Sequence, residues 1–295
     1  MFKINEIKEN DFSILELSNA SKTSIAKICL NEGARVVDLK LNGKIIIEEQ
    51  TNFDYKNSYA SAILFPFAGR VENGAYTFKF DDYQLDCNDN NNAIHGLVYD
   101  KTFEIFEPEE HQDNCSVTFN YYEKKPVVGF PFRYFLSVTY TLFESHLNTR
   151  VTIKNIDDKA FPFTLGWHPY FKTSNLNESS LVLSSKQKAV YDANMVAQIL
   201  ENSVFDGEIE LKDNQLDDCF VLKDNYTVLK TPDYNLKISA DAKKNYYQIF
   251  TPEKLPLIAI EPLTGIPNNF NNKVGLQVLE PGTTYVQNWE LNLVD

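Results

Sequence analysis

The stretch LSVTYTLFESHLNTRVTIK, residues 136–154, decides the fold class of this sequence. On both sides of a short polar break at 144–146, large apolar residues alternate with Ser, Thr, Asn, Arg and Lys. Successive side chains of a β-strand point to opposite faces, so the alternation predicts a hairpin with one buried and one solvated face. The residues expected on the buried face are Leu136, Val138, Tyr140, Leu142, Leu147, Val151 and Ile153.

Similar segments before and after this hairpin extend the prediction to an all-β fold. Short turns separate them, including Asn42-Gly43, a dipeptide typical of tight hairpins. Apolar spacing suggests a helix only at 192–202 (DANMVAQILEN). Strands joined by short turns are typical of a β-sandwich or barrel, and no linker rich in Pro, Gly or Ser divides residues 1–295, so one domain is expected. The other strand-like segments are 26–30, 35–41, 116–122, 235–240, 246–250 and 257–261.

The charge of the chain excludes several classes of partner. The 295 residues carry a formal charge of −13, and Lys and Arg form no long run. Nucleic-acid phosphates are neutralised by basic side chains, and anionic membranes repel an acidic protein, so neither is an expected partner. No apolar run reaches the length of a membrane span, and the first residues contain no apolar signal core. The oligomeric state is left open.

The cysteines and the absence of several common motifs limit the kinds of reaction and of binding site that the sequence can support. Cys29, Cys87, Cys115 and Cys219 lie far apart and form no CxxC pair, which predicts reduced, mostly buried thiols in a cytoplasmic protein. The sequence has no HExxH, GxGxxG, GxxxxGK[ST] or GxSxG motif. We therefore expect neither a metal nor a cofactor.

His168 is the first candidate for chemistry. It lies in FPFTLGWHPYF, residues 161–171, and Pro169 keeps its backbone extended. Alternation places Phe161, Phe163, Leu165 and Trp167 on the core face, and places Thr164, Gly166 and Tyr170 on the face that His168 shares. A lone histidine is more often structural, so a functional interpretation needs further polar groups nearby. His111 and His146 lie in polar segments and are expected at the surface.

Four other segments carry polar side chains next to glycines or apolar strands. Arg70 lies in FPFAGRVENGAYTF, and His95 directly precedes Gly96. Asp217 opens the apolar segment LDDCFVL, and Glu261 follows LPLIAI, where partial desolvation would raise its pKa. Arg70, Asp217 and Glu261 each have a simpler interpretation as a surface ion pair or a solvated strand end. None of the four is specific by itself.

Together and in order, these segments resemble the aldose 1-epimerase (galactose mutarotase) family over roughly residues 60–270. Arg70 in GRVENGAYTF matches the family's "NRI…G.F" segment, and His95 in HGL matches its "HGG". His168 in WHPYFK matches "HpYFN", and Asp217 in DDCFVL matches "DHxFxL". Glu261 in EPLTGIPNNFN matches "EPQ..PDA.N". The resemblance implies a large antiparallel β-sandwich, galactose mutarotase-like, with few short helices.

The sequence departs from the family pattern at four positions. Gly69 replaces an Asn, Leu97 replaces a Gly, Asp218 replaces a histidine and Leu263 replaces a Gln. These changes leave the preferred sugar open more than the reaction itself.

The resemblance implies interconversion of the α and β anomers of a free hexose such as galactose or glucose, without a cofactor. The C1 hydroxyl loses a proton while the ring oxygen gains one, the ring opens, and it closes on the other face. We expect Glu261 to act as the base and His168 as the acid, since a carboxylate and an imidazole are matched to these roles near neutral pH. Arg70, His95 and Asp217 are expected to bind the sugar hydroxyls.

Two alternatives keep a similar fold and change the function. A hexose-6-phosphate 1-epimerase would need further basic residues at the pocket rim, for which Arg133 in GFPFRYF is a candidate. A carbohydrate-binding β-sandwich without catalysis would stack sugars on exposed aromatic rings, and the chain contains 21 Phe and 16 Tyr. A structural β-protein without any sugar site is the third possibility.

Overall fold

The hairpin predicted from residues 136–154 is present in the computed structural model, which describes residues 1–9, 11–50, 53–212, 215–241, 245–253 and 255–295. Strand β13 (Tyr134–Leu142) pairs antiparallel with β14 (His146–Asn155), and Leu142 lies opposite Leu147. All seven side chains expected on the buried face are inaccessible to solvent. On the opposite face, Thr139 is half-buried and Arg150 is exposed.

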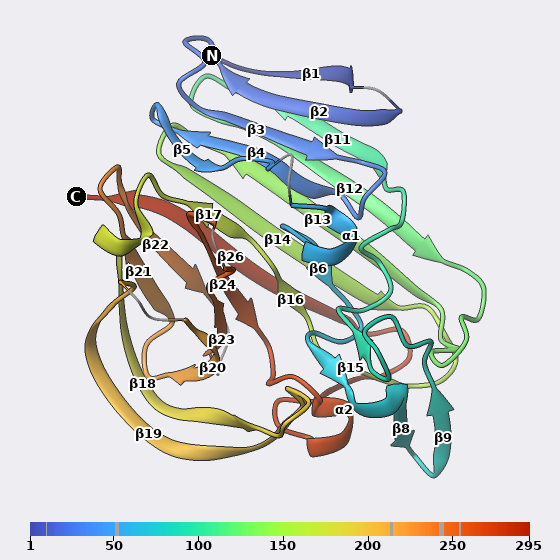
Figure 1. Ribbon diagram of the computed structural model, residues 1–295. Helices are drawn as coiled ribbons and strands as arrows, with labels where there is room; N and C mark the ends of the chain where they lie inside the picture. The colour runs from blue at the N-terminus through green and yellow to red at the C-terminus, as the bar shows by residue number, and fades with distance from the viewer. Residues whose placement is uncertain (10, 51–52, 213–214, 242–244, 254) are drawn as a thin grey trace.

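Two antiparallel sheets carry most of the chain (Figure 1). The first, drawn in blue, is formed in sequence order by β1 (Phe2–Glu9), β2 (Phe12–Asn19), β3 (Ile25–Cys29), β4 (Arg35–Leu41) and β5 (Lys44–Ile47). The second and larger sheet runs, in spatial order, through β11 (Glu104–Glu110), β12 (Cys115–Glu123), β13, β14, β26 (Thr284–Val294), β22 (Asn235–Ala240), β21 (Tyr226–Lys230), β18 (Ser180–Tyr191), β20 (Asp217–Leu222), β23 (Asn245–Phe250), β24 (Leu257–Leu263), β16 (Gly166–Trp167) and β6 (Ile63–Leu64).

The remaining elements are short or lie beside the large sheet. Strand β17 (Tyr170–Lys172) pairs with β24, and β19 (Ala197–Glu210) pairs with β18. Three two-stranded pieces complete the strands: β7 (Arg70–Val71) with β10 (Ala93–Ile94), β8 (Ala75–Phe78) with β9 (Asp81–Gln84), and β15 (Phe161–Phe163) with β25 (Gln277–Leu279). In the described part of the chain, the α-helices are α1 (Tyr55–Ser58) and α2 (Asn269–Asn272), each four residues long.

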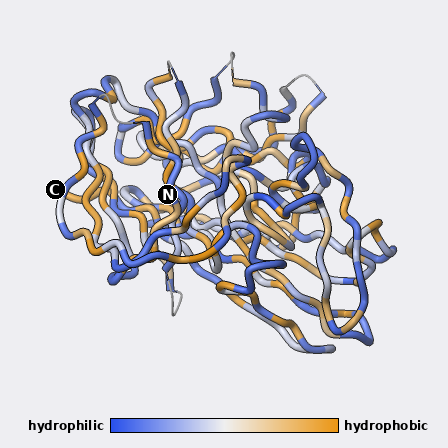
Figure 2. Tube along the Cα trace, turned by 60° about the horizontal axis from the view of Figure 1, so that its bottom comes forward, coloured by the Kyte–Doolittle hydropathy of each residue, from blue (hydrophilic) through white to orange (hydrophobic). Residues whose placement is uncertain are grey.

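One apolar core joins the two sheets. Leu17 and Val36 of the first sheet belong to the same buried cluster as Val138 and Tyr140 of the large sheet. The Tyr140 hydroxyl donates a hydrogen bond to the carbonyl of Ala34 at 2.9 Å, just before β4. Figure 2 shows the alternation of hydrophobic and hydrophilic residues along the strands that makes this packing possible. The all-β prediction is therefore confirmed.

Two local predictions have different outcomes. Asn42-Gly43 forms the turn between β4 and β5, with φ of 44° and 80°, as predicted. The helix expected at 192–202 is wrong, because this segment is a hairpin turn followed by the start of β19. The Asp192 carboxylate accepts hydrogen bonds from the N–H groups of Asn194 and Val196, at 2.9 and 3.0 Å, and so closes the turn. Backbone pairing with β18 then outweighs the helix-like apolar spacing.

The prediction of free, mostly buried cysteines is confirmed. All four thiols are free; Cys29, Cys115 and Cys219 are buried and Cys87 is exposed. No helix among the described residues combines the length and hydrophobicity needed to cross a membrane.

Candidate active site

The five residues predicted to act on a sugar line one cavity of about 270 Å³. They come from segments far apart in the sequence: Arg70 from β7, His95 after β10, His168 between β16 and β17, Asp217 from β20, and Glu261 from β24. The cavity is therefore formed by the pairing of β20, β23, β24 and β16 in one sheet, with loops bringing the remaining residues to it.

Backbone bonds hold His168 at a fixed position. Its N–H donates to the carbonyl of Ala62 at 3.0 Å, and its carbonyl accepts from the N–H of Ser61 at 2.8 Å. Its neighbour Trp167 packs into the main core beside Trp289. Because adjacent side chains of an extended segment point to opposite sides, the imidazole points away from this core and lines the cavity. The alternation predicted for this segment is thus confirmed.

Glu261 lies inside strand β24, not after it, and its residue is only 3 % exposed. Its Oε1 lies 3.4 Å from Nε2 of His168. The two groups expected to act as base and acid are therefore in direct contact. On the neighbouring strand, Gln248 of β23 lies opposite Glu261.

Burial determines the protonation of this pair. Loss of hydration raises the pKa of Glu261 well above its ordinary value, and the charge of Asp217 adds to the effect. Loss of hydration also lowers the pKa of His168 to about 4. Burial therefore favours the neutral form of both groups, with the proton of the pair on Glu261. The direction agrees with the desolvation expected from the sequence, since an isolated carboxylate in a buried site is disfavoured.

His95 reaches the cavity through an unusual backbone conformation. Its φ is 63° and that of Gly96 is 80°. A Cβ atom on Gly96 would lie 2.3 Å from the carbonyl oxygen of Phe65, so only glycine fits at this close approach. The His95 ring lies 4.9 Å from that of His168, centroid to centroid. Burial lowers the pKa of His95 well below its ordinary value, and the neighbouring His168 and Arg70 lower it further.

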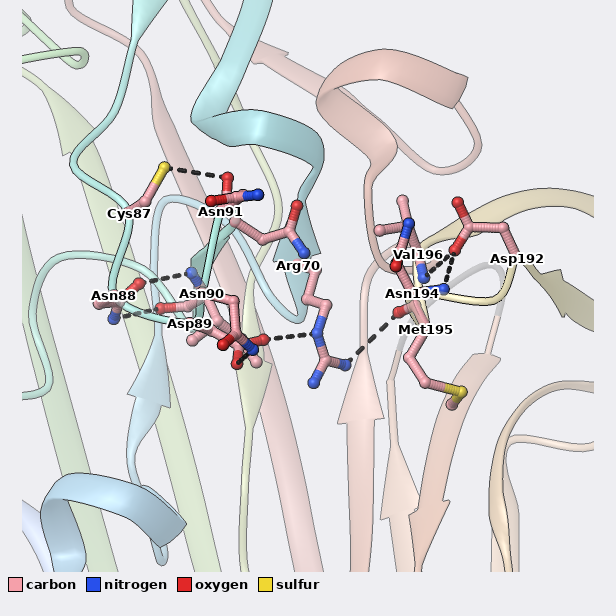
Figure 3. Close-up of polar contacts among 12 residues, drawn as sticks. Arg70, Cys87, Asn88, Asp89, Asn90, Asn91, Asp192, Asn194, Met195 and Val196 are labelled. Atoms are coloured by element: carbon pink, nitrogen blue, oxygen red, sulfur yellow. Dashed lines mark hydrogen bonds and ion pairs between the residues drawn. The ribbon is translucent and has the colours of Figure 1, made fainter.

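Arg70 is paired within the protein. Figure 3 shows its guanidinium between two loops, residues 88–92 and 192–196. Its Nε donates to Oδ2 of Asp89 at 2.6 Å, and its Nη1 donates to the carbonyl of Met195 at 3.4 Å. Both Asp89 and Met195 also line the cavity. Arg70 was predicted at the site from the sequence, whereas its two partners were not.

Asp217 belongs to a chain of hydrogen bonds. Its carboxylate accepts from Nε2 of Gln248 at 2.7 Å, and Oε1 of Gln248 accepts from the Tyr191 hydroxyl at 2.7 Å. Although Asp217 is exposed as a residue, its carboxyl group borders the cavity, and partial loss of hydration raises its pKa against the lowering effect of Arg70.

Gln248 is a site residue that sequence reasoning missed. It was present in the segment YYQIF as a polar side chain in an otherwise apolar strand, and it is 8 % exposed. A buried polar residue at such a position was the available signal, since it requires polar partners.

Arg133 does not lie at the cavity, where a phosphate-binding residue would be required. Its Nε is paired with Oδ2 of Asp157 at 3.0 Å, and it is not among the described residues that line the cavity. Basic side chains at the cavity wall are Lys56 on α1 and Arg70. In the part of the chain that the structure describes, no group of three or more His, Cys, Asp or Glu side chains is arranged to hold a metal ion.

Comparison with known proteins identifies the family. The family model described as aldose 1-epimerase matches residues 13–292. The uncharacterized protein YihR of Escherichia coli (strain K12) is 26% identical over 268 residues, which cover 85% of this chain and 84% of that protein.

Two solved structures show the same fold at low identity. A galactose mutarotase-like protein from Clostridium acetobutylicum superposes with a TM-score of 0.85 at 19% identity, covering 100% of this chain and 98% of that chain. The galactose 1-epimerase from Lactobacillus acidophilus NCFM gives a TM-score of 0.81 at 17% identity, with coverage of 100% and 98%. The family match over nearly the whole sequence, and the gathering of the five motif residues at one cavity, lead to one conclusion: the chain belongs to the aldose 1-epimerase family.

Proposed function

We propose that the chain catalyses mutarotation of a free aldohexose, with Glu261 as base and His168 as acid. The observation that carries this proposal is the 3.4 Å contact between Glu261 Oε1 and His168 Nε2 in the wall of a cavity lined by hydroxyl-binding groups. The two oxygens that exchange protons in mutarotation, O1 and O5, are bonded to the same carbon. A base and an acid in contact with each other can therefore reach both oxygens at once.

The reaction needs one group that accepts a proton and one group that donates a proton. A pair that shares a single proton supplies both. Hydroxyl groups of a bound sugar that donate to Glu261 stabilise its carboxylate and favour the proton on His168. Glu261 then removes the proton from the C1 hydroxyl as C1–O1 becomes a carbonyl. The C1–O5 bond breaks, and O5 takes the proton from His168. Rotation about C1–C2 and the reverse proton transfers close the ring with the other configuration, and the enzyme returns with one proton.

The other cavity residues position the sugar. Asp217 accepts hydroxyl hydrogens and is aligned by Gln248, while Arg70 and His95 bind from the opposite loops. Holding the hemiacetal against the proton-transfer pair replaces a chance encounter in solution by a prearranged geometry, which lowers the barrier.

Polarimetry on freshly dissolved α-D-glucose and α-D-galactose tests the proposal. The wild-type chain is expected to accelerate relaxation in a saturable manner. Glu261→Gln keeps the shape of the side chain and removes the base, so we expect a loss of about 10²–10⁴-fold in rate with unchanged circular dichroism. Equal rates for the wild type and a folded Glu261→Gln variant would contradict the assignment. Binding of sugar without acceleration by the wild type would favour a carbohydrate-binding protein instead.

A further inference from the structure

The carboxylate of Asp89 lies in the cavity wall, and the proposed proton transfers do not use it. Its side chain is 25% exposed and that of Arg70 is 29% exposed, and both border the same cavity as Glu261 and His168. Oδ2 of Asp89 accepts from Nε of Arg70 at 2.6 Å (Figure 3). A charge-assisted hydrogen bond of this length offsets the charge of the guanidinium in the cavity wall.

The loop that carries Asp89 is held in place independently of a ligand. The N–H of Asp89 donates to the carbonyl of Asn92 at 3.0 Å, and the N–H of Asn92 donates back to Asp89 at 2.8 Å. The Asn88 side chain accepts from the N–H of Ile94 at 2.8 Å and donates to the Ile94 carbonyl at 3.1 Å. Asp89 therefore reaches the cavity already oriented, as a specificity residue must be.

The opposite loop is fixed by the same arginine. Nη1 of Arg70 donates to the carbonyl of Met195, whose φ is 57°. Arg70 thus connects both loops, and Figure 3 shows this arrangement. The guanidinium keeps donor capacity on Nη2, while Asp89 keeps acceptor capacity on its carboxylate. Side by side, these groups provide one donor and one acceptor, as neighbouring sugar hydroxyls require.

The charges around the cavity favour an uncharged ligand. Its described wall contains the carboxyl groups of Asp89, Asp217 and Glu261 and the cations of Lys56 and Arg70. Lys56 is exposed on α1, where water and salt screen its charge, and Arg70 is neutralised by Asp89. A phosphate group entering this wall would meet Asp89 at short range, and like-charge contact in a partly desolvated site is strongly unfavourable.

We propose that Asp89 determines substrate specificity: it binds a hydroxyl of an uncharged sugar and, by neutralising Arg70, discriminates against sugar phosphates. This inference rests on the proposed function, because it concerns the same cavity. Without the Asp89 charge, Arg70 would be free to attract an anionic substituent.

Calorimetric titration of the wild type and Asp89→Asn with glucose and with glucose 6-phosphate tests this inference. Sugars at anomeric equilibrium are used, so that turnover does not affect the binding signal. For the wild type, we expect glucose to bind more tightly than its phosphate. For Asp89→Asn, we expect glucose affinity to fall about tenfold and phosphate affinity to rise, which changes the ratio of the two affinities by at least about 30-fold.

Asp157→Asn is the matched control, since Asp157 also pairs with an arginine, Arg133, but lies outside the cavity wall. It is expected to leave the affinity ratio within about twofold of the wild type. Asp89→Ser provides a second variant if Asp89→Asn does not fold. An unchanged ratio in the folded Asp89 variant, or a wild type that prefers the phosphate, would overturn the inference. The wild-type polarimetry reports separately on the proposed function, so the two failures are distinguishable.

Discussion

At the scale of single residues, burial determines what Glu261 and His168 can do. Both side chains are nearly inaccessible to solvent. Burial raises the pKa of Glu261 and lowers the pKa of His168, and both shifts favour the neutral form of the group. Burial therefore favours a pair that holds its proton on Glu261 over a pair in which both groups are charged. The backbone beside the cavity is also constrained, because His95 and Gly96 both have positive φ.

We expect a bell-shaped pH profile of kcat/KM. Below the His168 pKa of about 4, the pair takes up a second proton and no base remains, so activity falls. Above the raised pKa of Glu261, the pair loses its proton and no acid remains, so activity falls again. Polarimetry across the pH range in which the protein stays folded measures both limbs, after subtraction of the spontaneous rate. An acid limb centred near 6.5, the ordinary histidine pKa, would contradict the argument from burial.

Gly96→Ala and Gly43→Ala separate backbone strain from steric contact. Both glycines have φ of 80°, but a Cβ at Gly43 meets no atom within 4 Å, whereas at Gly96 it meets the Phe65 carbonyl oxygen at 2.3 Å. We expect Gly43→Ala to lower the free energy of unfolding by about 1 kcal/mol. Gly96→Ala is expected to cost about 3 kcal/mol or more and to reduce activity by displacing His95. Urea denaturation measures both; equal costs would contradict the close approach.

At the scale of elements, side-chain hydrogen bonds connect strands and turns to parts of the chain outside their own sheet or hairpin. Tyr140 on β13 is fully buried and donates to Ala34 next to β4, so a single hydroxyl connects the large sheet to the first sheet. The turn at 192–196 shows the same principle, since Asp192 fixes a hairpin that carries Met195 to the cavity. Elements here are therefore stabilised as much by their partners as by their own sequences.

Tyr140→Phe tests the connection between the sheets. Removal of the hydroxyl leaves the Ala34 carbonyl without this donor, and we expect the free energy of unfolding to fall by about 1–2 kcal/mol. Tyr122→Phe on β12 is the control, because that side chain is 48% exposed, and its effect is expected within about 0.5 kcal/mol. Equal stability of wild type and Tyr140→Phe in chemical denaturation would show that the bond contributes nothing.

At the scale of the whole molecule, the cavity depends on the complete fold. Its walls include residues from Lys56 to Pro267, and the apolar core below them continues from the first sheet into the large one. The expectation of one domain, made from the sequence, stays a prediction, and unfolding measurements can test it.

We expect one cooperative thermal transition, in which circular dichroism, tryptophan fluorescence and catalytic activity change together. Saturating sugar should raise the transition temperature, because a ligand that binds only the folded state stabilises it by mass action. Both tryptophans, Trp167 and Trp289, are buried and stack near each other, and Trp167 adjoins His168, so fluorescence reports on the core close to the cavity. Two separate transitions would contradict the one-domain expectation.

The sequence by itself determined the all-β class, the inward faces of strands such as β13, and the five motif residues. Alternation has a period of two along the chain, so the buried positions of β13 and the orientation of His168 could be predicted locally. Five segments in family order then named Arg70, His95, His168, Asp217 and Glu261, all of which line the cavity.

Tertiary structure alone decided the rest. The start of β19 became a strand through pairing with β18, a partner that apolar spacing does not reveal. The roles of Gln248 and Asp89 and the raised pKa of Glu261 depend on which side chains meet across strands and loops, and on how much water they exclude. Such contacts join residues far apart in the sequence, so only the folded chain brings together the groups that set the charge of the site.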